Sequence, residues 1–86
     1  MAQGKWRRVG TVVHYYTKIG VAIIDLRNSL VLGDQISIEG STTDLQQTVD
    51  SMQIEHKTVE KAAKGDSIGL KVGGRCRKGD KVYKQG

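Results

Sequence analysis

Residues 30–38 read Leu-Val-Leu-Gly-Asp-Gln-Ile-Ser-Ile, an apolar run that meets a Gly-Asp pair and then alternates between apolar and polar residues. Glycine and aspartate favour turns, because glycine adopts positive φ without steric cost and the short carboxylate bonds to nearby backbone. Alternation at period two is typical of a strand that buries one face. The stretch therefore predicts a tight turn next to a β-strand.

Two more Gly-Asp pairs follow, at residues 65–66 and 79–80, and each precedes another short alternating segment. Upstream, β-branched and aromatic residues are concentrated in residues 8–16 and 21–26. Such residues favour strands, so these two segments predict an initial hairpin.

The middle of the chain is less regular. Residues 46–55 alternate loosely and predict one further strand. Residues 58–64 are too few for an independent helix, so a short turn or strand is expected there.

Six or seven short strands without a long helical period predict an all-β fold, and specifically a small closed antiparallel β-barrel. Closure would also remove exposed strand edges. Because the chain has 86 residues, one domain is expected and a two-domain enzyme is excluded. We expect this domain to cover residues 8–84, with a basic N-terminal segment over 1–7 and a C-terminal tail over 85–86.

Strict alternation along residues 8–16 would divide the side chains between two faces. The predicted core face holds Val9, Thr11, Val13 and Tyr15, and the other face holds Val12, His14 and Tyr16. An alternative is that His14, Tyr15 and Tyr16 form an exposed aromatic platform that stacks nucleic-acid bases.

The amino-acid composition limits the kinds of site and membrane attachment that the chain can have. Cys76 is the only cysteine, so neither an internal disulfide nor a multi-thiolate zinc site is expected. The longest apolar run, residues 21–24, is far below the roughly 20 residues of a membrane span. We therefore expect a cytoplasmic protein without membrane attachment, metal or cofactor.

The formal net charge is +5, and the charge is unevenly distributed. Basic residues exceed acidic ones in residues 1–27 and 71–86, whereas acidic residues exceed basic ones in residues 28–70. The two ends of the chain are therefore basic, and their distance in space decides whether they form one surface.

The order of these pieces resembles domain II of translational GTPases, the family that includes elongation factor Tu. The resemblance is carried by the stretch Leu30–Ile36, the strand Val49-Asp50-Ser51-Met52-Gln53, the segment Val59–Leu70 and the turn Arg77-Lys78-Gly79-Asp80-Lys81-Val82. It implies a barrel whose first and last strands are neighbours, acting as a stand-alone domain that contacts tRNA, ribosomal RNA or another protein. No phosphate-binding Gly-x-x-x-x-Gly-Lys-Ser/Thr segment is present, so neither nucleotide binding nor hydrolysis is expected.

On this basis the predicted function is a non-catalytic, translation-related module that binds tRNA or ribosomal RNA through one basic surface. The candidate RNA-binding residues are Lys5, Trp6, Arg7, Arg8, Arg75, Arg77, Lys78, Lys81 and Lys84. The resemblance also places Gln53 at the position that, in tRNA-carrying members, lies against the terminal adenosine. The alternatives are an ordinary solubilising surface and a protein-docking or accessory barrel with no role in RNA binding.

Two further groups invite a catalytic interpretation. His56 follows Glu55, and Cys76 lies between two arginines, whose charge lowers a thiol pKa. A nucleophilic cysteine also needs a base and an oxyanion hole, and the sequence supplies neither in a recognisable pattern. The prediction is therefore that the chain is not an enzyme.

Overall fold

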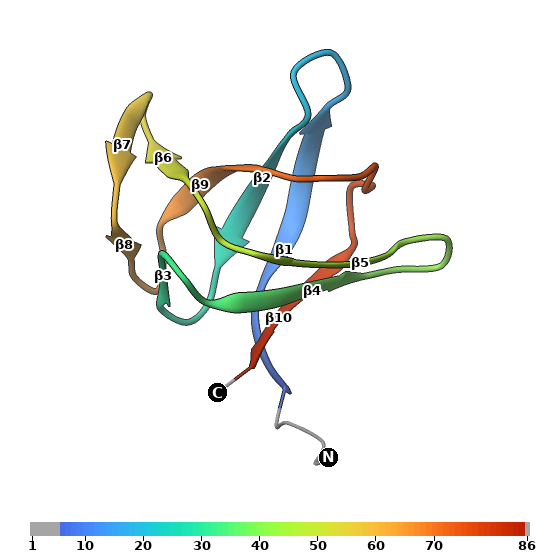
Figure 1. The fold of residues 1–86 in the computed structure, drawn as a ribbon, viewed down its shortest axis with the longest axis horizontal. Helices are drawn as coiled ribbons and strands as arrows, with labels where there is room; N and C mark the ends of the chain where they lie inside the picture. Colours follow the sequence, from blue (N-terminus) through green and yellow to red (C-terminus); the bar gives the residue numbers. More distant parts are fainter. Residues whose placement is uncertain (1–5, 86) are drawn as a thin grey trace.

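Residues 6–85 are the part of the chain that the computed structural model describes, and they form ten β-strands and no helix (Figure 1). The all-β class is thus confirmed. The strands are β1 (Trp6–Tyr16), β2 (Val21–Leu26), β3 (Leu30–Val31), β4 (Gln35–Glu39), β5 (Asp44–Thr48), β6 (Met52–Ile54), β7 (Lys57–Val59), β8 (Lys61–Ala62), β9 (Ser67–Lys71) and β10 (Lys81–Gln85). No helix in this described part is both long and apolar enough to cross a membrane.

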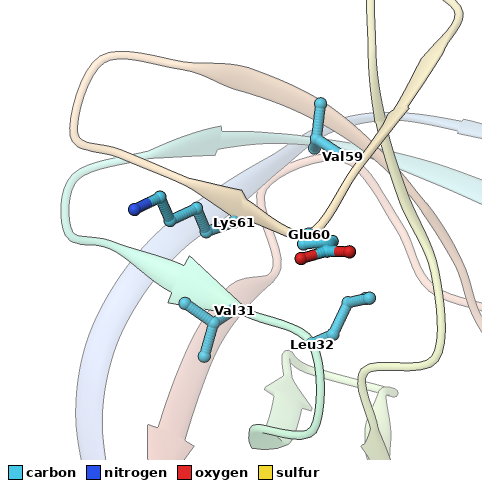
Figure 2. A pocket seen from close by; sticks show the side chains of 5 residues that line it. All are labelled: Val31, Leu32, Val59, Glu60 and Lys61. Atoms are coloured by element: carbon cyan, nitrogen blue, oxygen red, sulfur yellow. The ribbon is translucent and has the colours of Figure 1, made fainter.

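Eight strands form one antiparallel sheet in the order β5-β4-β10-β1-β2-β9-β6-β7. The first and last strands are neighbours, as expected, because Trp6 lies opposite Gln85 and Thr11 opposite Lys81. Strands β3 and β8 form a separate two-stranded sheet, in which Val31 lies opposite Lys61 (Figure 2).

The predicted closed barrel is wrong. Strands β5 and β7 are the two edges of the large sheet, and no backbone ladder joins them within residues 6–85. The sheet curls instead, and one side chain bridges part of the gap. The Gln47 amide donates to the carbonyl of Lys71 at 2.9 Å and accepts from the N–H of Gly73 at 2.7 Å. It thereby links β5 to the last residue of β9 and to the segment that follows it.

The strands are also shorter and more numerous than predicted. Residues 46–55 form two strands rather than one, because the chain leaves the ladder at Val49. The Val49 N–H donates to the carbonyl of Asp34, and its carbonyl accepts from the N–H of Gly33, both at 2.9 Å. This exchange turns the chain toward β6 and starts a new pairing.

The three Gly-Asp turns share one geometry. Gly33, Gly65 and Gly79 have φ values of 93°, 93° and 95°, which an L side chain rarely adopts. Each following aspartate closes the turn twice, because its N–H donates to the carbonyl three residues upstream and its carboxylate accepts from that residue's N–H at 2.8–3.0 Å. These are type II turns, and the sequence predicted their positions correctly.

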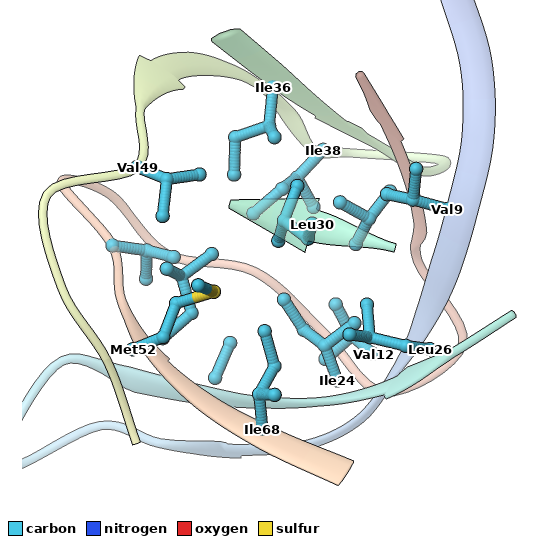
Figure 3. Close-up of a cluster of buried hydrophobic side chains, with 14 of the residues drawn as sticks. Val9, Val12, Ile24, Leu26, Leu30, Ile36, Ile38, Val49, Met52 and Ile68 are labelled. Carbon is cyan, nitrogen blue, oxygen red and sulfur yellow. The ribbon is translucent and has the colours of Figure 1, made fainter. Parts of the chain in front are cut away.

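The core lies inside the curl of the large sheet and is covered by β3 (Figure 3). Its fully buried aliphatic side chains come from most strands. The largest are Ile24, Leu30, Ile36, Ile38, Met52, Ile68 and Leu70. At about 25 cal/mol per Å² of apolar surface removed from water, burial of these side chains is the main stabilising term.

The predicted faces of β1 are partly wrong. Val12 is buried and Val13 is 38% exposed, the reverse of the expected alternation. The pairing of β1 shifts register between Arg8 and Gly10 and again between Val12 and His14. Each β-bulge inserts one residue and so exchanges the faces that follow it. Tyr15 remains packed against the core because of the second shift.

Candidate functional site

A groove lies between the first Gly-Asp turn and the β7–β8 segment, with a volume of about 690 Å³ (Figure 2). Its lining residues are Val31, Leu32, Val59, Glu60 and Lys61. The Leu32 N–H donates to the carbonyl of Glu60 at 2.9 Å and fixes the groove floor. Val31 and Leu32 are nevertheless 39% and 37% exposed, so the groove presents apolar surface to solvent.

The three equivalent turns show that this exposure is not required by the turn itself. Leu32 occupies the second turn position, and the same position is held by Lys64 and Lys78 in the other two turns. All three side chains are exposed. A lysine thus satisfies the backbone geometry there. Leu32 instead adds apolar surface next to the exposed Val31, and contiguous apolar patches, unlike single exposed residues, often mark contact sites.

A second apolar surface lies on the outer face of the sheet, over β1, β2, β9 and β6, with a volume of about 460 Å³. Ile19 and Tyr16 are 61% and 47% exposed at the end of this surface that is next to the β1–β2 turn. Gln53 also lies here, exposed on β6 opposite Gly69 and Thr58. Its predicted contact with a terminal adenosine stays untested.

The predicted basic residues fall into two groups. Strand pairing brings Arg7 opposite Lys84 and Arg8 opposite Tyr83, with Lys81 and Trp6 on the same two strands. Lys84 is partly engaged, because its ammonium donates to the Ser29 carbonyl at 2.9 Å and lies 3.9 Å from an Asp34 carboxylate oxygen.

The second group lies at the other end of β1. Arg75, Arg77 and Lys78 belong to the β9–β10 connection and line a hollow with His14, Tyr15, Thr17 and Cys76. Lys81 of the first group directly follows the connection that carries the second group. The single basic surface expected from the sequence stays a prediction. Lys5 lies outside the described residues.

The aromatic residues at the end of β1 do not form a flat platform. The rings of His14 and Tyr16 meet edge to face at 4.3 Å, and Tyr15 is half-buried against the core. Successive side chains of a strand point to opposite faces, so Tyr15 lies on the face opposite His14 and Tyr16.

Cys76 is buried, and burial together with the nearby Asp80 carboxylate raises the pKa of its thiol to about 11. The thiol is therefore protonated at neutral pH, despite the two flanking arginines. His56 lies at the β6–β7 turn and lines a different surface from Cys76. Among the described residues, no cluster of three or more His, Cys, Asp or Glu side chains is arranged to hold a metal ion.

Two features of the structure were not predicted from the sequence. The groove at Leu32 depends on the pairing of β3 with β8, which joins residues about 30 positions apart. Aligning the three Gly-Asp turns would have shown a leucine where the others have lysine. The β6–β7 turn, in which Glu55 and His56 both adopt positive φ, carries no glycine or asparagine to signal it.

Comparison with known proteins relates the chain to proteins named as a protease and a collagenase. No family model matches the chain. Over 82 residues, 92% of this chain, it is 46% identical to a Methanocaldococcus jannaschii protein named as an uncharacterized protease. Over 78 residues it is 38% identical to the collagenase of Porphyromonas gingivalis. The chain spans only 20% and 22% of the lengths of these relatives.

The fold is also that of a solved structure. The C-terminal domain of a Geobacillus thermoleovorans protein described as a U32 peptidase superposes with a TM-score of 0.86 over 93% of both chains, at 19% sequence identity. At that identity the likeness concerns the fold alone.

These findings overturn the resemblance to domain II of translational GTPases. The predicted translation-related function, the predicted tRNA or ribosomal RNA partner and the prediction that the chain is not an enzyme are all contradicted, since the relatives are named as a protease and a collagenase. The physical reason is that Gly-Asp turns solve a local problem, a positive φ followed by a capping carboxylate, which recurs in unrelated small β-domains. This chain is similar to one segment of proteins named as proteases, and it shares the fold of a U32 peptidase C-terminal domain.

Proposed function

We propose that this chain is a peptidase-associated β-domain that takes part in proteolysis together with the remainder of a U32-type peptidase. One observation carries the proposal, namely 46% identity across 92% of the chain with a named protease of which it spans 20%. The match to an isolated C-terminal domain supports the same reading, because that domain has the same fold from end to end.

The groove of Figure 2 supplies the contact surface for the rest of the peptidase. Val31 and Leu32 project from a turn that is closed by two hydrogen bonds between Val31 and Asp34. A partner would therefore meet preorganised apolar side chains, and association would require little ordering. Glu60 and Lys61 at the margin provide one charge of each sign, which favours a defined orientation of the partner.

The test uses the Porphyromonas gingivalis collagenase. Deleting the segment that matches this chain should lower kcat/KM for collagen cleavage at least about tenfold, and grafting this chain into its place should restore most of that loss. An unchanged kcat/KM after deletion would refute the proposal.

Leu32→Lys in the grafted chain tests the groove. It copies the residue found at the equivalent position of the other two turns, so the fold should be unaffected. We expect kcat/KM to fall about fivefold or more, because a solvated ammonium replaces apolar contact area. The matched control is Lys64→Ala, which alters the same position of another turn and should change kcat/KM less than about twofold.

A further inference from the structure

The hollow that contains the second basic cluster has a volume of about 430 Å³. One wall is the end of β1, which contributes His14, Tyr15 and Thr17. The other wall is the β9–β10 connection, from Arg75 to Lys78. The function proposed above does not use this surface.

The connection is held in place at several points. The Val12 N–H donates to the carbonyl of Asp80 at 2.8 Å, and the Val12 carbonyl accepts from the N–H of Gly79 at 2.7 Å. Cys76 is only 2% exposed and anchors the middle of the connection in the core. Arg75 and Arg77 flank this buried residue and are both exposed, so their side chains start from a fixed backbone.

The charge in the hollow has no counter-charge in its lining. Three of the seven lining residues are permanent cations, and none is a carboxylate. The neighbouring Asp80 is buried, and its carboxylate accepts the backbone N–H of Arg77 at 2.8 Å. Tyr15 and Thr17 also line the hollow, and both carry a hydroxyl group that can donate a hydrogen bond. An anionic group would therefore find both charge and donors.

We propose that this hollow binds an acidic peptide segment through its carboxylates. Arginine forks pair with carboxylates in bidentate geometry, which gives such a contact direction as well as strength. The choice of a peptide as partner rests on the proposed function, since peptidases meet polypeptides. It also fits the size of the hollow, whose three cations come from four consecutive residues and match a few neighbouring carboxylates.

The test is a fluorescence-anisotropy titration of the 86-residue chain with a labelled, C-terminally amidated peptide of about six glutamates. The same peptide with glutamine at every position is the uncharged comparison. We expect binding of the glutamate peptide only, weakening several-fold between about 50 and 200 mM salt.

The decisive variant combines Arg75→Gln, Arg77→Gln and Lys78→Gln, which should weaken binding about tenfold or more. The control combines Arg27→Gln, Lys57→Gln and Lys64→Gln, exposed residues after β2, on β7 and after β8, and removes the same number of charges. It should weaken binding less than about threefold. Circular dichroism of both variants verifies the fold.

Equal losses in the two variants would overturn the proposal, because net charge alone would then explain binding. So would equal binding of the glutamine peptide, or tighter binding of a single-stranded RNA of matched charge that the decisive variant also abolishes. Because the titration uses the isolated chain, its failure leaves the collagenase experiment unaffected. A failed graft together with specific peptide binding would refute the proposed function instead, and leave the hollow as a peptide site of another kind.

Discussion

At the scale of single residues, Cys76 shows how burial can override neighbouring charge. Its pKa lies at about 11 rather than 9.0, because the folded protein shields the thiol from water and places Asp80 nearby. The unfolded chain therefore releases this proton before the folded chain does. It follows that the free energy of unfolding falls as pH rises from about 9 to about 11, by at most about 3 kcal/mol.

Urea denaturation at several pH values between 8 and 11 measures this effect. Because lysines and tyrosines titrate in the same range, the informative quantity is the difference between the wild type and Cys76→Ala. The variant should be less stable at pH 8 by about 1 kcal/mol, through lost packing, and the difference should shrink or change sign by pH 11. Parallel curves would show that the thiol does not titrate differently in the two states.

At the scale of elements, the β6–β7 hairpin contains a turn that its sequence does not favour. Glu55 and His56 have φ values of 51° and 68°, the two positive angles of a type I′ turn. Such turns prefer Asn-Gly, and a non-glycine residue at positive φ costs about 1 kcal/mol or more. Replacing both residues, as Glu55→Asn with His56→Gly, should raise the free energy of unfolding by about 1 kcal/mol, measured as a higher urea midpoint at unchanged slope.

The matched control is Glu55→Ala with His56→Ala, which removes both polar side chains but keeps a Cβ at each position. We expect it to leave stability within about 0.5 kcal/mol of the wild type. If both variants gained a similar free energy of unfolding, the destabilisation of the turn would come from the two side chains rather than from the positive backbone angles.

The elements also show where a single sequence is informative. The three Gly-Asp turns were predictable because every atom that closes them lies within four consecutive residues. The bulges in β1 were not, since a bulge exists only relative to a partner strand, and the partners of β1 begin at residues 21 and 81. Strict alternation therefore assigned Val12 and Val13 to the wrong faces.

At the scale of the whole molecule, charge along the chain predicted a single basic surface. The pairing of β1 with β10 brings the two basic ends of the chain together, as expected. The β9–β10 connection meets β1 at Val12, through hydrogen bonds of Gly79 and Asp80, and Lys81 lies opposite Thr11. Basic residues are therefore spread along much of β1, whose 11 residues at about 3.3 Å each span several times a Debye length of roughly 8 Å, so salt screens the charges at its two ends from each other.

The curled sheet also needs contacts that hold it together, because its edge strands β5 and β7 do not pair with each other. Within residues 6–85, Gln47 makes the only side-chain hydrogen bonds between β5 and the end of β9 or the segment after it, one to the Lys71 carbonyl and one from the Gly73 N–H. Gln47→Ala removes both bonds at once. We expect it to lower the free energy of unfolding by about 1 kcal/mol and to speed hydrogen exchange of the Gly73 amide several-fold, because that N–H loses its acceptor.

Gln46→Ala is a control in the same strand, since successive side chains of a strand point to opposite faces and Gln46 is exposed. It should change neither stability nor the Gly73 exchange rate appreciably. If Gln47→Ala and Gln46→Ala gave the same exchange rate at Gly73, the glutamine would not be holding the edge. The curl would then be maintained by the core alone, in which Ile36 and Ile38 of β4 are buried in one cluster with Met52 and Leu70.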